Sequence, residues 1–401
     1  MRTVEFDLVS TLLISMVVLF LGRLLVGKVA VLERLNIPAP VVGGAVIALV
    51  LALVDSLIHV KLGFNLGLKD TLLLMFFTTV GLAADARMLV KGGPRLLVFL
   101  AISVVLIVIQ NLIGIGTTRL LDLHPIVGLL GGSITLVGGH GTGAAYAGRL
   151  GETMNIQGIM ELTMACATAG LVIGAVLGGP VAEYLLKRHK LAASAPAEIA
   201  LASRNEPEDE AVTSGSLINT LFLILLCLTA GKMLVGVLAE TGFILPDFVF
   251  CLFLGVLIRN AGTVTRVFRV SDTTVDVVGS VALSLFLVMA LMTMRLLDLV
   301  NLAGPLLVIL AAQTVAIALY AVVVTFRVMG RNYDAAIMAA GQIGFGMSST
   351  ACALAIMKSV TERHGPSPLA FLIVPMVGAF FIDIMNALII QAYLALPLFG
   401  F

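Results

Sequence analysis

The feature that most constrains this chain is a series of ten apolar segments, each roughly 20 residues long, which is enough for a helix to cross about 30 Å of hydrocarbon. Hydrophobic residues make up 60% of the chain and charged residues 12%, whereas about 25% of the residues in a soluble domain are charged. The sequence therefore predicts an all-α polytopic membrane protein that is solvated partly by lipid. The predicted spans are 7–29, 37–58, 70–90, 94–119, 156–186, 214–239, 244–260, 274–296, 304–328 and 369–396.

The charge balance and the small number of metal-binding side chains argue against several other classes of protein. A net charge of +1 argues against a nucleic-acid partner. The five His are scattered, so we expect no metal cluster, and nothing indicates an organic cofactor. Glu5 and Asp7 precede the first apolar segment, where a cleavable signal would carry positive charge, so we expect this segment to be a true span. The cysteines all lie inside apolar runs and are predicted to pack as thiols: Cys166, Cys227, Cys251 and Cys352.

Two further apolar segments, 125–148 and 334–358, differ from the predicted spans because Gly, Ser and Thr cluster near their centres. Gly costs about 1 kcal/mol at an interior helix position, so neither segment favours a continuous helix. We predict that each forms a re-entrant helical hairpin, which dips into the membrane and returns to the same side. The alternative is that the small residues only permit close packing of helices.

A polar stretch at 187–213 divides the chain into two halves of similar length. It contains Pro, Ser and a run of charges, which is typical of a flexible linker. The halves resemble each other: GRLLVGK at 22–28 is echoed by GKMLVGV at 231–237, and GGPRLLV at 92–98 by AGPLLVI at 303–309. We therefore predict two repeats, 1–186 and 214–401, each with five spans and one hairpin. Chance similarity among apolar segments is the alternative.

The repeats and the distribution of Lys and Arg predict the orientation in the membrane. Five spans per repeat is an odd number, so the second repeat is inverted relative to the first. With the N-terminus outside, most of the 24 Lys and Arg fall at cytoplasmic ends of spans, as the positive-inside rule requires. We therefore expect both termini in the periplasm and the linker in the cytoplasm. The first hairpin then enters from outside and the second from the cytoplasm.

Opposed hairpins between inverted repeats are typical of secondary transporters. Non-helical backbone is tolerated at membrane depth only where protein or a wet cavity satisfies it. The N-terminal ends of helices favour anions and free carbonyls favour cations, so the hairpin centres are predicted to form a substrate and ion site near the midplane. The candidates are Ser133, Thr135, Gly139, His140, Gly141 and Thr142 in the first hairpin, and Gln342, Gly346, Ser348, Ser349 and Thr350 in the second.

Two ionisable residues inside apolar sequence are further candidates. His140, in GGHGTG, is a ligand contact, a proton carrier or a structural hydrogen-bonding group. Asp383 is the one charge in VGAFFIDIMNALII, and Asn386 is three residues further on, on the same helical face. An ionisable residue inside a span is costly and usually functional. Asp383 and Asn386 are therefore candidate sodium ligands; Asp383 could instead pair with an amino-acid ammonium or be structural.

Amide side chains also occur inside corresponding spans of the two predicted repeats. Gln110 and Asn111 lie in the span at 94–119, and Gln313 lies in the span at 304–328. These side chains either line the site or tie helices together, and the sequence leaves both interpretations open.

Three segments resemble the bacterial glutamate:Na⁺ symporter family: GGSITLVGGHGTGAA in the first half, AAGQIGFGMSST in the second, and TERHGPSPLAFLIVPMVGAFFIDIMNALII near the end. The resemblance covers nearly the whole chain, including its central linker. It implies uptake of L-glutamate across the bacterial inner membrane with Na⁺ as the coupling ion. It also implies a homodimer in which the hairpin-bearing domain moves like an elevator against a dimer scaffold.

The residues themselves leave rival functions open. The first is sodium-coupled transport of another carboxylate, such as a di- or tricarboxylate, on the same architecture. The second is an intramembrane enzyme with His140 or Asp383 as the catalytic group, although no Ser motif with a nucleophile turn accompanies them. A passive channel is less consistent with the sequence, because opposed hairpins favour alternating access. We therefore predict a transporter and not an enzyme.

Overall fold

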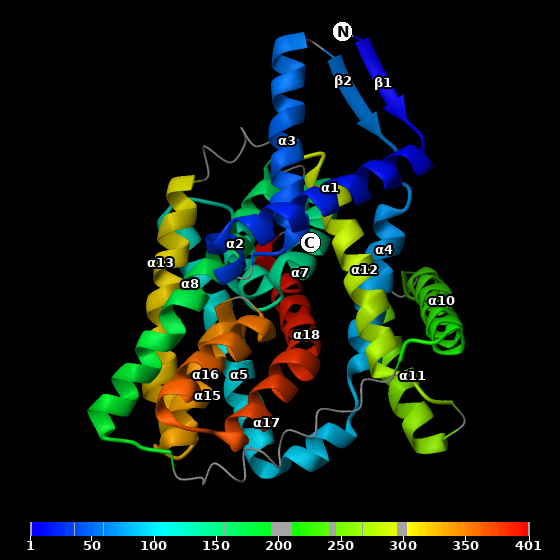
Figure 1. The fold of residues 1–401 in the computed structure, drawn as a ribbon. Coiled ribbons are helices and arrows are strands. Elements are labelled where there is room, and N and C mark those ends of the chain that lie inside the picture. Colours follow the sequence, from blue (N-terminus) through cyan, green and yellow to red (C-terminus); the bar gives the residue numbers. More distant parts are fainter. Residues whose placement is uncertain are drawn as a thin grey trace. The chain divides into compact units, whose positions relative to one another are not determined.

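The computed structural model describes residues 2–35, 37–58, 60–154, 158–193, 211–239, 246–266, 268–294, 303–347 and 349–399. Over these residues the regular secondary structure is helical except for one two-stranded sheet (Figure 1). Eight of the described helices are long and apolar enough to cross a membrane, which confirms the prediction of an all-α polytopic membrane protein. They are Leu8–Lys28, Gly93–Leu120, Ile159–His189, Ser214–Gly236, Asp247–Thr265, Asp272–Leu291, Gly304–Val328 and Pro368–Leu394.

One of the ten predicted spans forms a shorter helix. The segment predicted at 70–90 is helix α4 (Lys69–Ala83), whose 15 residues extend about 22 Å at the helical rise of 1.5 Å per residue. A turn follows α4, in which Arg87 N donates to Asp85 Oδ1 at 2.9 Å. Helix α3 (Ala39–Ile58) is 20 residues long, close to the predicted span at 37–58.

The chain divides into two compact units, each assembled from both halves of the sequence. Unit 1 comprises Met1–Ala83, Ala144–Leu162 and Val212–Ala303, and unit 2 comprises Ala84–Gly143, Thr163–Ala211 and Gly304–Phe401. These units differ from the predicted repeats, 1–186 and 214–401, because each repeat would contribute to both units. Helix α8 (Ile159–His189) extends into the predicted linker at 187–213, most of which lies outside the described residues.

Unit 1 consists of packed helices and a small sheet. Helix α1 (Leu8–Lys28) packs on α3, and α4 packs on both α11 (Asp247–Thr265) and α12 (Asp272–Leu291). Helix α10 (Ser214–Ala239) packs on α11, and the short α2 (Ala30–Arg34) follows α1. Strand β1 (Arg2–Phe6) pairs in parallel with β2 (Val60–Phe64), and Phe6 stacks on Phe64 with ring centroids 5.5 Å apart. This sheet is an addition to the predicted all-α fold.

Small residues bring α4 close to α11 and α12. A Cβ at Gly81 of α4 would lie 2.1 Å from the carbonyl oxygen of Leu252 on α11. A Cβ at Gly279 of α12 would lie 2.4 Å from Thr79 Oγ1 on α4. Neither position has room for a side chain, so the helices of unit 1 approach each other through glycine surfaces, as is common between membrane helices.

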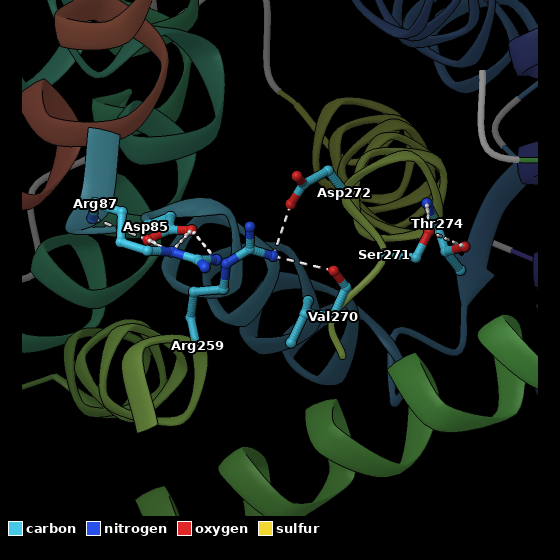
Figure 2. Close-up of polar contacts among 7 residues, drawn as sticks. All are labelled: Asp85, Arg87, Arg259, Val270, Ser271, Asp272 and Thr274. Atoms are coloured by element: carbon cyan, nitrogen blue, oxygen red, sulfur yellow. Dashed lines mark hydrogen bonds and ion pairs between the residues drawn. The ribbon is translucent and has the colours of Figure 1, made fainter. Parts of the chain in front are cut away.

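An ion pair fixes the connection between α11 and α12 (Figure 2). Arg259 Nη1 lies 2.7 Å from Asp272 Oδ1 and donates to the Val270 carbonyl at 3.1 Å. The Arg259 side chain is 7% exposed and that of Asp272 is 63% exposed, so most of the desolvation falls on the guanidinium. Figure 2 also draws the ion pair between Asp85 and Arg87 of unit 2, at 2.9 Å.

Unit 2 contains the second Gly-rich segment and most of the first. The first forms α6 (Pro125–Leu129), the π-helical turn η1 (Leu130–Ile134) and α7 (Gly139–Met154), whose residues from Ala144 onward belong to unit 1. The second forms α15 (Tyr333–Met347) and α16 (Thr350–His364). The surrounding elements are α5 (Arg87–Leu120), α8, α13 (Ala303–Tyr320), η3 (Ala321–Thr325), α14 (Phe326–Val328), α17 (Pro368–Met376), η4 (Val377–Phe381), α18 (Ile382–Leu394) and η5 (Pro397–Phe399).

Candidate functional site

Both Gly-rich segments are helices that are interrupted near their centres. The first breaks at Gly132, whose ψ of −136° is non-helical, and restarts at Gly139 with a φ of 64°. In the second, α15 ends at Met347 and α16 begins at Thr350, after Ser349 in an extended conformation. Each interruption removes helical partners from nearby backbone groups. The breaks occur inside the predicted segments, and the re-entrant course of these segments stays a prediction.

Carboxamide side chains from two other helices bind the first break. Ser133 N donates to Oδ1 of Asn111 on α5 at 3.0 Å. Asn386 of α18 donates from Nδ2 to the Ser133 carbonyl, also at 3.0 Å. Gly132 permits this approach, because a Cβ there would lie 2.9 Å from Asn111 Oδ1. Side chains of α5 and α18 therefore supply hydrogen bonds where the helix is interrupted.

The second break is bound by the residue next to Asn111. Gln110 Nε2 donates to the carbonyl of Gly346, close to the end of α15, at 2.7 Å. Gln313 of α13 donates from Nε2 to the backbone carbonyl of Gln110, also at 2.7 Å. Helix α5 therefore contacts both breaks through two adjacent residues. Helix α13 binds the backbone of α5 at one of these two residues, Gln110.

The first turns of the half-helices carry the remaining hydroxyl candidates. Ser349 caps α16 because its Oγ accepts from Cys352 N at 3.3 Å. Thr350 is the first residue of α16, and a Cβ on Gly378 of η4 would lie 3.0 Å from Thr350 Oγ1. Thr142 lies in the first turn of α7 and is 8% exposed. Hydroxyls beside a helix N-terminus provide donors for an anionic group such as a carboxylate.

His140 lies between Gly139 and Gly141 in the first turn of α7 and is 8% exposed. Its Nε2 lies 3.0 Å from Thr168 Oγ1 on α8. Thr168 Oγ1 also lies 2.8 Å from the Met164 carbonyl, so when the Thr168 hydroxyl donates its one proton there, His140 Nε2 is the donor in the His140–Thr168 contact. The imidazole therefore ties α7 to α8, which supports the structural alternative among the three roles predicted for His140.

Two other predicted site residues form hydrogen bonds inside unit 2. Gln342 is fully buried; its Nε2 donates to Ser103 Oγ at 3.1 Å, and its Oε1 accepts from Thr325 Oγ1. Thr135 Oγ1 donates to the Leu130 carbonyl at 2.6 Å, within the first break. A ligand would have to displace these internal bonds to reach Gln342, so its binding role stays a prediction.

Asp383 differs from these residues because its carboxylate forms no hydrogen bond or ion pair with the described part of the chain. It lies in the first turn of α18, directly after the π-helical turn η4, and π-helical turns are frequent at functional sites. Its side chain is partly exposed. Asn386, one helical turn further on, contacts the first break through Ser133. Helix α18 therefore carries an available carboxylate close to this break.

The residues that hold the breaks overlap only partly with the predicted ligands. Gln110, Asn111 and Gln313 stand out in the sequence as amides in apolar spans, whereas Ser103 and Thr325 carry no such signal because single hydroxyls are common in membrane helices. Ser348 lies outside the described residues. Within the described ranges, no three His, Cys, Asp or Glu side chains form a group that could hold a metal ion.

Comparisons with known proteins give one consistent result. The model of the sodium/glutamate symporter family matches residues 4–366. The chain is 48% identical to the sodium/glutamate symporter of Escherichia coli strain K12 over 396 residues, which is 98% of this chain and 99% of that protein. It is 45% identical to the sodium/glutamate symporter of Haemophilus influenzae over 394 residues, which is 97% of this chain and 98% of that protein.

Proposed function

The chain belongs to the sodium/glutamate symporter family, and we propose that it couples the entry of sodium to the uptake of L-glutamate across the bacterial inner membrane. The observation that carries this proposal is the presence of two interrupted helices in one compact unit, with an available carboxylate on α18. Interrupted helices provide binding groups for both an anionic substrate and a cation. A continuous helix bundle would provide neither.

In this proposal the two ligands bind different groups of unit 2. The first turns of α7 and α16, with Thr142, Ser349 and Thr350, bind the carboxylates of glutamate. Asp383 pairs with sodium or with the ammonium group of the substrate. Such pairing neutralises charge before the loaded site crosses the low-dielectric part of the membrane, where an unpaired charge is costly. Sodium then raises the affinity for glutamate, and glutamate raises the affinity for sodium by the same factor.

The division into two units supports an elevator-type movement of unit 2 against unit 1. Unit 2 contains both breaks and Asp383, so a rigid movement of this unit would carry the whole site.

We further propose that the repeats are inverted, that the Gly-rich segments are re-entrant, that both termini are periplasmic and that unit 1 forms the contact between two protomers. A single cysteine at Ser203, in a variant without native cysteines, should then react with impermeant reagents only from the cytoplasmic side.

Uptake of labelled glutamate into proteoliposomes tests the proposed function directly. An inward sodium gradient should drive accumulation of intact glutamate, and a proton gradient without sodium should not. Accumulation driven by the proton gradient alone would contradict sodium coupling. Competition by aspartate, citrate and malate distinguishes the family substrate from another carboxylate, because stronger competition by citrate or malate than by unlabelled glutamate would favour the rival. Recovery of a chemically altered product would favour an enzyme.

A further inference from the structure

The carboxamide residues that bind the two breaks leave several polar atoms without partners. Gln110, Asn111, Ser133 and Gln313 are completely buried, and Asn386 is 1% exposed. Among the described residues, no hydrogen-bond partner exists for Oε1 of Gln110 and Gln313, Oδ1 of Asn386, Oγ of Ser133 or Nδ2 of Asn111. Buried polar atoms are almost always hydrogen-bonded, so five unpartnered atoms within one cluster require an explanation.

A continuous series of hydrogen bonds connects these side chains within unit 2. Gln313 binds the Gln110 carbonyl, and Gln110 is followed in the chain by Asn111. Asn111 binds Ser133 N, and the Ser133 carbonyl binds Asn386. A Cβ built on Gly132 would lie 3.3 Å from the Gln110 carbonyl and 2.9 Å from Asn111 Oδ1, so Gln110 and Asn111 lie directly against the first break. We name these five polar side chains, Gln110, Asn111, Ser133, Gln313 and Asn386, the carboxamide cluster.

The existing bonds determine which way each carboxamide points. Gln110, Gln313 and Asn386 each donate from nitrogen to a backbone carbonyl, and a carbonyl can only accept. Rotating any of these amides by 180° would bring two oxygens together, so their side-chain oxygens must remain the unpartnered atoms. The cluster therefore offers three amide oxygens and one hydroxyl oxygen, against a single unpartnered amino group on Asn111.

This excess of acceptors indicates a cation. Neutral amide, hydroxyl and carbonyl oxygens are hard ligands that suit ions of the alkali and alkaline-earth groups. Neutral ligands in a buried site compensate the charge of a monovalent cation more readily than that of a divalent cation. In addition, Gln110 binds the Gly346 carbonyl, close to the C-terminal end of the 15-residue helix α15, where the helix dipole is negative.

We propose that the carboxamide cluster binds a sodium ion through neutral oxygens, separately from Asp383. This inference rests on the sodium coupling proposed above and assigns one ion to Gln110, Gln313, Asn386 and Ser133. The ion would connect α5, α13 and α18 to the first break. Sodium binding would therefore stabilise the interrupted helix in the geometry that presents the first turn of α7 to glutamate.

The sharpest test removes only the unpartnered hydroxyl. Ser133→Ala retains the backbone bonds to Asn111 and Asn386, so the variant should fold like the native protein. Thermal unfolding of purified protein in lipid nanodiscs is followed against sodium concentration, without glutamate, at constant ionic strength set by choline chloride. A ligand that binds only the folded state raises its stability with concentration. The loss of one oxygen ligand should raise the half-saturating sodium concentration about three- to tenfold.

Thr118→Val is the matched control. Thr118 is also fully buried in unit 2, but its hydroxyl donates only to carbonyls of its own helix, at 3.1 Å to Gly114 and 2.9 Å to Ile115. Its sodium titration should match that of the native protein. Gln313→Met removes a second cluster oxygen at similar side-chain length and should shift the titration in the same direction as Ser133→Ala.

The remaining outcomes each support or overturn the proposal. Asp383→Asn should lose uptake but keep the native half-saturating sodium concentration for thermal stabilisation. This result would show that the stabilising ion is separate from any ion at Asp383. An unchanged titration in both Ser133→Ala and Gln313→Met would overturn the proposal and leave only water in the cluster. Equal stabilisation by potassium would do the same. The proposal would also be overturned if glutamate without sodium stabilised the native protein but not Ser133→Ala. The ammonium group of the substrate would then occupy the cluster. Failed uptake by native protein with an intact titration would refute the proposed function and not this site.

Discussion

Units 1 and 2 both bring helices together at glycines, such as Gly81 in unit 1 and Gly114 in unit 2, but they differ in the side-chain amides that bind interrupted helices in unit 2. In unit 1, Gly81 and Gly279 let continuous helices approach until there is no room for a Cβ. In unit 2, Gln110 and Asn111 reach from α5 to the interrupted helices. A continuous helix satisfies its own backbone, whereas an interrupted one needs donors and acceptors from its neighbours. Amide side chains that bond to an interrupted helix therefore indicate where backbone groups need partners from neighbouring helices.

The contrast predicts that changes in unit 2 affect transport and that changes in unit 1 affect the amount of folded protein. The largest expected effect on transport is that of Asp383→Asn, which keeps the shape of the side chain and removes its charge. Because the carboxylate has no partner in the part of the chain that the structure describes, the variant should insert and fold normally but lose sodium-driven glutamate accumulation. Uptake over a range of sodium concentrations, normalised to protein in the membrane, measures this effect. Unchanged accumulation with unchanged sodium dependence would reduce Asp383 to a structural residue.

Gly81→Leu tests unit 1. The side chain would collide with the Leu252 carbonyl, from which even a Cβ lies only 2.1 Å away. We expect destabilisation by about 1–3 kcal/mol or more, as for other overpacked sites, and a matching loss of folded protein in thermal unfolding. Glutamate affinity of the protein that does fold should be unchanged.

The control for Gly81→Leu is Gly236→Ala in the same unit, because a Cβ at Gly236 meets nothing within 4 Å. It should stay within about 0.5 kcal/mol of the native stability, as substitutions at uncrowded surface positions do. Altered glutamate affinity in Gly81→Leu without any loss of stability would break the contrast between the two units.

The two asparagines that bind the first break should have unequal effects. Asn111→Ala removes the acceptor for the Ser133 N–H, which we expect to cost about 1–3 kcal/mol. Asn386→Ala should cost less, because the Ser133 carbonyl also accepts from Gly138 N at 3.0 Å. Both contact the same residue, so their effects should not add in the double variant. Chemical or thermal unfolding of the three variants measures this, and equal, additive losses would contradict the proposed bracing of the break.

Asp272→Asn is expected to have a small effect. The Asp272 side chain is 63% exposed, and Arg259 keeps its bond to the Val270 carbonyl, so the loss should be about 1 kcal/mol or less, as for exposed ion pairs. Uptake per folded molecule should be native, which makes this variant the charge-matched control for Asp383→Asn. A transport defect equal to that of Asp383→Asn would show that the effect of neutralising an Asp is not specific to unit 2.

Hydropathy predicts most of this fold because long apolar helices depend on local sequence alone. The end of α4 at Ala83 is less predictable, since it depends on the turn that contains Asp85 and not on a change in hydropathy. The pairing of β1 with β2 is also invisible locally, because the strands are joined only by contacts between distant residues such as Phe6 and Phe64. The end of α4 and the pairing of β1 with β2 therefore depend on individual hydrogen bonds or stacking contacts.

The candidate site divides in the same way. Clusters of Gly predict both helix breaks, because Gly is unfavourable inside a helix. Gln342 illustrates the limit: its polarity suggests a ligand, yet its amide bonds to Ser103, which is 239 residues away in the chain. Sequence patterns identify polar groups inside a membrane helix, but only the tertiary structure shows which of those groups already have partners. Asp383 is the predicted residue whose availability the structure supports most clearly.

The most direct test of the central claim, that the breaks of unit 2 bind sodium and glutamate together, is calorimetric titration of glutamate into purified protein in nanodiscs at low and high sodium. The Kd for glutamate should fall as sodium rises, and the Kd for sodium should fall by the same factor when glutamate is present. Ser349→Ala and Thr142→Ala should each weaken glutamate binding several-fold, as expected for the loss of one hydrogen bond. A glutamate Kd that is independent of sodium and unchanged in both variants would contradict the claim and move the site away from these breaks.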